Sequence, residues 1–203
     1  MDVTELPRPP LAVGVMGSAS GPLDAEVVAR VRRLGAAIAA SGCTLVTGAC
    51  PGFSYVAVEG AKSAGGLVVG ISPALSETEH VQRFGSPVEG FDLLVYTGSG
   101  LMGREVINIR SSDIVVIVGG RSGTLGEFAI AYDEGRLIGV LAASGGVADM
   151  VEELIAKMNK DTGAWVIYDD DPERLVGRLL EYYRTTHFRR PSALHDITAS
   201  GPA

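Results

Sequence analysis

The sequence has little of several features that would assign a protein to a class at once. Its 203 residues include two cysteines, Cys43 and Cys50, which are too few for a disulfide framework. No apolar run approaches the ~20 residues of a membrane span, and residues 1–7 lack the basic and apolar regions of a secretory signal. The three histidines have no metal-ligand spacing with cysteines or carboxylates. We therefore expect a cytoplasmic protein with no metal site, no other cofactor and no membrane partner.

Positive charge is also scarce. The chain has 17 lysines and arginines against 24 acidic residues, a formal net charge of −7. Nucleic-acid binders usually carry a basic face, so we expect no nucleic-acid partner, although a few local groups are enough to hold a small anion. Lysine is limited to Lys62, Lys157 and Lys160, and only these three are candidates for chemistry that requires a lysine.

Short β-rich runs alternate with longer helical patterns, which predicts an α/β fold. We expect a doubly wound, mainly parallel sheet with helices on both faces, in the Rossmann-like arrangement. Residues 1–187 are predicted to form a single nucleotide-binding domain, followed by an irregular C-terminal tail, 188–203. The expected strands are 11–16, 44–47, 67–71, 92–96, 114–118, 137–141 and 165–168. The expected helices are 24–41, 54–64, 101–112, 124–135, 147–159 and 171–186, with a long irregular stretch at 72–90.

The most distinctive segment is the turn from the strand at 114–118 into the next helix. Glycines let a backbone approach a ligand closely, and a helix N-terminus favours an anion, so this turn is a candidate phosphate site. Its candidate binding residues are Gly119, Gly120, Ser122, Gly123 and Thr124. It matches neither a P-loop nor a dinucleotide fingerprint, and a purely steric role for the glycines is the alternative. Gly17 and Ser18, after the first strand, form a second candidate anion cradle.

Two charged side chains near this turn have competing interpretations. Thr124 and Glu127 have the spacing of a capping box, in which Glu127 is structural, whereas a carboxylate beside a phosphate site is also a candidate catalytic group. Arg104, Asn108 and Ser111 share one helix face. This face points either to solvent or toward the ligand crevice, where Arg104 and Asn108 would bind phosphate or substrate.

These residues resemble the LOG (LONELY GUY) family of Rossmann-like proteins, often mislabelled lysine decarboxylases. The family signature Pro-Gly-Gly-x-Gly-Thr-x-x-Glu is matched by Gly119-Gly120, Gly123-Thr124 and Glu127, and Arg104 lies in the preceding helix, where the family has Met-x-x-Arg-Lys. Val118 replaces the signature proline, Arg121-Ser122 inserts one residue, and Leu101 and Glu105 replace the methionine and the lysine. The chain is therefore similar to a divergent branch, close to molybdenum-cofactor carrier proteins.

The resemblance implies a homodimer and a nucleoside monophosphate or similar phosphorylated small molecule as ligand. Our first hypothesis is a nucleoside 5′-monophosphate phosphoribohydrolase, an N-glycosidase releasing base and ribose 5-phosphate, with Glu127 and Arg104 as catalytic residues. The alternative is a non-catalytic binding or carrier protein for a nucleotide or molybdenum cofactor. Lysine decarboxylation is rejected, because a pyridoxal-phosphate enzyme needs a Schiff-base lysine and no lysine follows the carboxyl end of a strand.

Overall fold

The computed structural model describes residues 10–19, 21 and 23–186, so the predicted tail at 188–203 lies outside the described residues. The strands are β1 (Ala12–Gly17), β2 (Thr44–Thr47), β3 (Val68–Ser72), β4 (Leu93–Tyr96), β5 (Ile114–Val118), β6 (Leu137–Leu141) and β7 (Trp165–Asp169). The helices are α1 (Ala25–Ala40), α2 (Phe53–Ser63), α3 (Glu77–Gln82), α4 (Gly100–Arg110), α5 (Ser122–Asp133), α6 (Val151–Met158) and α7 (Pro172–Thr185), with a 3₁₀ turn, η2 (Ala148–Met150), before α6.

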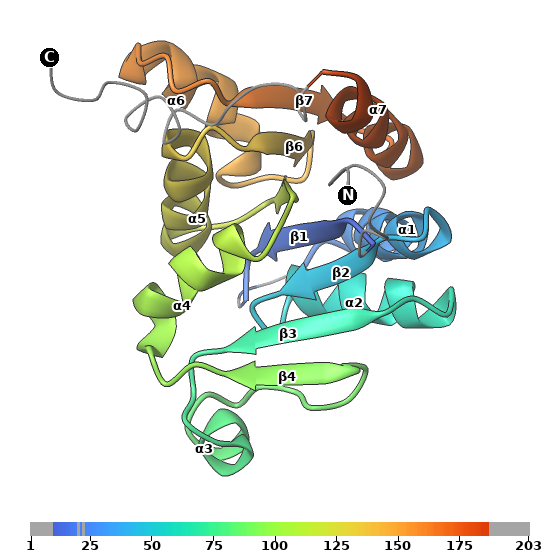
Figure 1. The fold of residues 1–203 in the computed structure, drawn as a ribbon, viewed down its shortest axis with the longest axis vertical. Coiled ribbons are helices and arrows are strands. Elements are labelled where there is room, and N and C mark those ends of the chain that lie inside the picture. The colour runs from blue at the N-terminus through green and yellow to red at the C-terminus, as the bar shows by residue number, and fades with distance from the viewer. Residues whose placement is uncertain (1–9, 20, 22, 187–203) are drawn as a thin grey trace, which may run out of the picture.

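The strands form one sheet in the order β4-β3-β2-β1-β5-β6-β7, and every described pairing is parallel (Figure 1). This confirms the predicted Rossmann-like fold and replaces "mainly parallel" with wholly parallel. The chain moves outward from β1 to β4 and then crosses to β5 on the other side of β1, where Gly17 lies opposite Val118. The strand order therefore reverses between β1 and β5, and ligands of doubly wound folds bind outside the carboxyl ends of strands at such a point.

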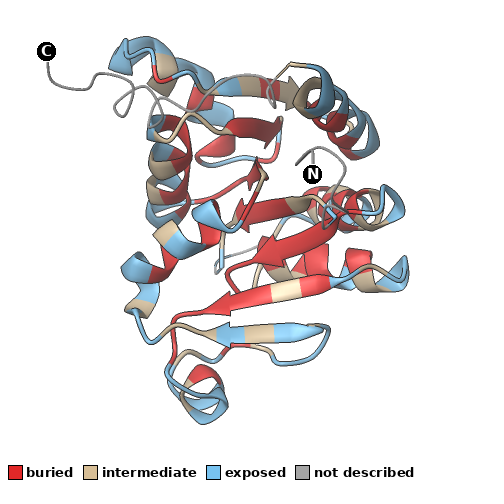
Figure 2. Ribbon diagram, in the orientation of Figure 1, coloured by how far each residue is buried: buried red, intermediate tan, exposed pale blue. Residues whose placement is uncertain are grey.

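Two apolar cores hold the helices on the two faces of the sheet. In β5, Ile114, Val116 and Val118 pack against α1, α2 and α7, whereas Val115 and Ile117 pack against α4, α5 and α6. This alternation explains why the whole strand is apolar: both of its faces are covered. Figure 2 shows the central strands almost wholly buried and the edge strand β4 largely exposed.

Two expectations about helices were wrong. The stretch at 72–90 contains α3, which begins after a Ser76 side-chain cap and packs through buried His80. His80 contacts Ser72 Oγ at 2.8 Å through Nδ1 and the Pro87 carbonyl at 3.0 Å through Nε2, so its role here is structural. Helix α5 begins at Ser122, two residues earlier than predicted. None of the described helices is both long and apolar enough to cross a membrane.

Candidate functional site

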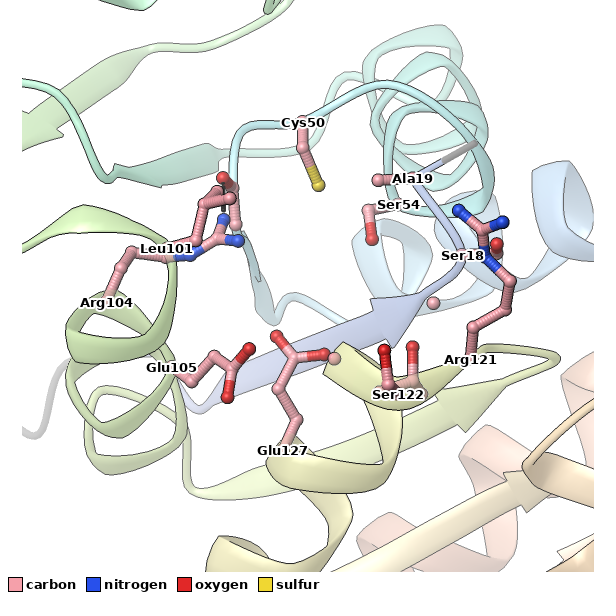
Figure 3. A pocket seen from close by; sticks show the side chains of 14 residues that line it. Ser18, Ala19, Cys50, Ser54, Leu101, Arg104, Glu105, Arg121, Ser122 and Glu127 are labelled. Carbon is pink, nitrogen blue, oxygen red and sulfur yellow. Dashed lines mark hydrogen bonds between the residues drawn. The ribbon is translucent and has the colours of Figure 1, made fainter. Parts of the chain in front are cut away.

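A cavity of about 330 Å³ lies where the strand order reverses, beyond the carboxyl ends of β1 and β5 (Figure 3). Four segments that are distant in sequence meet there: the loop after β1, the loop from β2 into α2, the start of α4 and the start of α5. The lining residues are Gly17, Ser18, Ala19, Gly48, Cys50, Ser54, Leu101, Arg104, Glu105, Arg121, Ser122, Gly123, Thr124 and Glu127. The size is that of a small-molecule site.

Three helices begin at this cavity, and none has a side-chain cap. Helices α2, α4 and α5 lack a capping hydrogen bond at Gly52, Ser99 and Arg121. Of the helices that begin elsewhere, α1 and α7 are capped by Asp24 and Asp171, whereas α6 has no side-chain cap. The first N–H groups of a helix have no partner within the helix, and the helix dipole adds partial positive charge there. The wall formed by the start of α5 therefore favours an anion.

Arg104 is the buried cation of the cavity, which the exposed Arg121 also lines. Its side chain comes from α4 and donates to the carbonyl of Gly48, where any Cβ would collide with the guanidinium. The residue is 7% exposed, and its Nε is buried with no hydrogen-bond partner. Arg104 and Asn108 are thus turned inward, while Ser111, which shares the predicted face, is exposed at the end of the helix. Arg104 therefore lines the cavity, whereas Asn108 is buried beside Glu127 and does not line it. Binding of a ligand by either residue stays a prediction.

Glu127 lies on the cavity floor and does not cap α5. Because the helix begins at Ser122, Thr124 is its third residue and no capping box forms, so the capping interpretation was wrong. Glu127 is 7% exposed and accepts one long hydrogen bond, from Asn108 Nδ2 at 3.5 Å. Burial raises the pKa of Glu127 to about 7, against the opposing charge of Arg104 and with a contribution from nearby Glu105.

Glu105 is a second carboxylate in the cavity, and our sequence reasoning did not select it. It is 5% exposed and packs against α5, where a Cβ at Gly126 would lie 2.9 Å from Glu105 Oε2. Burial raises the pKa of this carboxyl also. Two features of the sequence could have indicated Glu105. It lies three residues before Asn108, and the glycines at positions 123 and 126 allow close approach to the helix that carries them.

The remaining predicted residues divide into two groups. Gly17, Ser18, Ser122, Gly123 and Thr124 line the cavity, and Asn108 lies behind Glu127. Gly119 and Gly120 do not line it. The N–H of Gly119 donates to Ser144 Oγ at 2.8 Å, and both glycine carbonyls accept hydrogen bonds from the segment that leads into η2. These two glycines shape the turn that carries α5.

Neither cysteine nor lysine chemistry has the required geometry here. Cys50 lines the cavity, but burial raises the pKa of its thiol, which disfavours the reactive thiolate. None of the three lysines lines the cavity; Lys62, at the far end of α2, binds Asp92 at 2.9 Å.

Comparison with known proteins identifies the family of the chain. A model of the SLOG cluster4 family matches residues 10–176. The chain belongs to the SLOG cluster4 family. An uncharacterized protein of Archaeoglobus fulgidus is 35% identical to this SLOG chain over 131 residues, which cover 64% of the chain and 80% of the relative.

Solved structures resemble the SLOG chain over nearly their whole lengths. The molybdenum cofactor binding protein of Rippkaea orientalis is 28% identical, with a TM-score of 0.70, and the match covers 87% of this chain and 98% of that one. The molybdenum cofactor carrier protein of Chlamydomonas reinhardtii is also 28% identical, with a TM-score of 0.68 and coverage of 84% and 99%. The similarity to molybdenum-cofactor carrier proteins is thereby confirmed.

A DNA-processing protein of Helicobacter pylori shares the fold alone. It is 21% identical, with a TM-score of 0.59, and the match covers 86% of this chain and 82% of that one. The Helicobacter pylori protein binds single-stranded DNA. Our expectation of no nucleic-acid partner for this chain stays a prediction.

Proposed function

We propose that the protein binds a phosphorylated small molecule in the cavity between β1 and β5, as a binding or carrier protein. The observation that carries this proposal is Arg104, a buried guanidinium that lines a cavity into which the uncapped N-terminus of α5 opens. A buried charge is costly unless it is paired, and an anionic ligand supplies a partner for it.

Phosphate fits these donors best. The backbone N–H groups of Ser122, Gly123 and Thr124 lie at the start of α5, and phosphate oxygens accept such hydrogen bonds while their charge is stabilised by the dipole. Arg104 adds a charge-assisted donor, a stronger kind of hydrogen bond than a neutral one. Gly17 and Ser18 also line the cavity.

The relatives favour a molybdenum cofactor as the phosphorylated ligand. Two proteins named for binding or carrying molybdenum cofactor share 28% of their residues with this chain across almost their entire length. We propose a molybdenum cofactor or a nucleotide as the phosphorylated ligand, and a homodimer as the assembly.

Titration calorimetry of the purified chain with AMP, GMP and inorganic phosphate tests the proposal. Arg104→Met should weaken binding of all three by roughly 10–100-fold, the effect of removing a hydrogen bond to a charged group. Arg110→Met, which removes an exposed arginine of the same helix, is the matched control and should bind as wild type. Arg104→Met also loses its bond to Gly48, so its folding is checked by circular dichroism. Binding that is absent in wild type, or equal in the two variants, contradicts the proposal.

A second candidate function is the phosphoribohydrolase, and one observation favours it. Glu127 lies inside the cavity beside Arg104, with its pKa raised to about 7, near the operating pH of a general acid. Incubation with nucleoside monophosphates followed by an assay for ribose 5-phosphate separates the two candidates. Binding without release supports the carrier, whereas release that Glu127→Gln abolishes supports the hydrolase.

A further inference from the structure

The floor of the cavity carries hydrogen-bond acceptors that the protein leaves unpaired. The Glu105 carboxylate accepts no hydrogen bond from any described residue, and Glu127 accepts only the 3.5 Å bond from Asn108. Asn108 lies outside the cavity lining and is fully buried, and its Oδ1 has no partner. Figure 3 shows the carboxylates of Glu105 and Glu127 directed into the same space.

Asp169, another buried acid of the described chain, shows how unusual it is for a buried carboxylate to have so few hydrogen-bond donors. The carboxylate of Asp169 accepts from Arg174 Nε at 2.8 Å, from Arg178 Nη1 at 2.9 Å and from the Asp171 N–H at 3.0 Å. Buried carboxylates are normally paired in this way, because an unpaired one is costly. Among the buried acids of the described residues, only Glu105 and Glu127, the two at the cavity, lack such a set of donors.

A phosphate group cannot relieve this shortage, because it also presents acceptors and its charge is repelled by carboxylates. We infer that the ligand carries, besides its phosphate, an adjacent pair of hydrogen-bond donors directed at Glu105 and Glu127, and that Glu105 sets specificity for that pair. This inference rests on the proposed function, since the phosphate is what fixes the ligand in the cavity.

The distance along α5 from its start, where the phosphate would bind, to Glu127 limits the ligand. Glu127 follows Ser122 by five residues, which is about 7.5 Å along the axis of α5. The donor pair thus lies one to two helical turns from the phosphate. Two chemical groups present such a pair: the cis-diol of a ribose, and the aminopyrimidinone edge of guanine or a pterin. An adenine edge has one amino group beside a ring acceptor and does not fit.

Three nucleotides separate these sources when they are titrated in buffer containing EDTA. The 2′,3′-dideoxy form of AMP has neither donor pair, AMP has the diol, and the dideoxy form of GMP has the aminopyrimidinone edge. We expect AMP or dideoxy-GMP to bind about tenfold or more tightly than dideoxy-AMP, as hydrogen bonds to a charged group allow. AMP as the tighter ligand identifies the diol, and dideoxy-GMP identifies the base edge.

Glu105→Gln should then weaken binding of the donor-bearing nucleotide without weakening binding of inorganic phosphate. It should bring the donor-bearing nucleotide to within about twofold of dideoxy-AMP, because its amide replaces one acceptor by a donor. It should leave inorganic phosphate binding unchanged or tighter, because a repelling charge is gone. Glu181→Gln, at an exposed position of α7, is the control and should change neither. The comparison requires that Glu105→Gln melts at or above the wild-type temperature. Binding of dideoxy-AMP to the variant then reports that the phosphate site of the variant is intact.

Equal binding of the three nucleotides, or a donor advantage that survives in Glu105→Gln, overturns the inference while the phosphate site stands. Binding that appears only when Mg²⁺ replaces EDTA also overturns it, because the carboxylates would then hold a cation. If neither inorganic phosphate nor any nucleotide binds wild type under either condition, the proposed function itself is wrong.

Discussion

Replacing Glu127 by glutamine should stabilise the ligand-free protein, although it removes an ionisable group from the candidate site. The pKa of Glu127 is raised from 4.5 to about 7, chiefly by burial. Glutamine keeps the shape of the side chain and its contact with Asn108 but has no charge to bury. The gain in stability of the variant measures the free energy that folding loses by keeping an ionisable group at this position.

The size and pH dependence follow from that shift. A group whose pKa is raised in the folded state binds its proton more tightly there, so its contribution is full below pH 4.5 and is lost as pH rises to about 7. At ~1.4 kcal/mol per pKa unit, the cost of the ionised Glu127 above pH 7 is about 3 kcal/mol. For a chain of this length, that is roughly 6–12 °C in melting temperature.

Thermal melts of wild type and Glu127→Gln at half-unit steps from pH 4.5 to 8.5 test this reasoning. The variant should match wild type near pH 4.5, gain stability up to about pH 7 and hold a constant advantage above it. Glu181→Gln should follow wild type throughout, because this glutamate is exposed. A Glu127→Gln variant that melts at or below wild type at pH 8 would refute the account of Glu127 as a costly buried carboxylate.

Three further outcomes are expected. Gly120→Ala should cost about 1–3 kcal/mol in a urea titration, because Gly120 has φ +102° and a Cβ would collide with Thr124, whereas Gly177→Ala, with open space around the new Cβ, should be neutral or stabilising. Asp169→Asn should destabilise the protein at pH 7 by about 1–2 kcal/mol, because hydrogen bonds from Arg174 above all lower the pKa of Asp169 to about 2. This contribution to stability is present above pH 4 and is lost toward pH 2. Equal stability of the variant and wild type at pH 7 would contradict the prediction. Light scattering should give a dimer of about 42 kDa, and a mass near 21.1 kDa would refute the dimer inferred from family resemblance.

Much of the fold is predictable because strands buried on both faces leave a strong pattern. The apolar run of β5 and the glycines after it indicated a central strand leading into a helix, and both segments expected to hold an anion, after β1 and after β5, contribute to the cavity lining. Parallel strands bring their carboxyl ends to one edge of the sheet, so the site follows from the strand order.

The missed features depend on tertiary contacts. Helix α3 is six residues long and has a single buried residue, His80, so it has no apolar periodicity to detect. The start of α5 was placed too late because Thr124 and Glu127 imitate a capping box, whereas the turn fixed by Gly119 and Gly120 begins the helix at Ser122. Glu105 was overlooked because a glutamate beside an arginine on a helix normally faces solvent, and only the packing of α4 against α5 buries it.

The most direct test of phosphate binding is a crystal structure from crystals soaked with AMP or with inorganic phosphate. The proposal predicts density for a phosphate within hydrogen-bond distance of the backbone N–H groups of Gly123 and Thr124, with the Arg104 side chain turned toward the ligand. An anion bound elsewhere, with a side chain filling the space before α5, would contradict it.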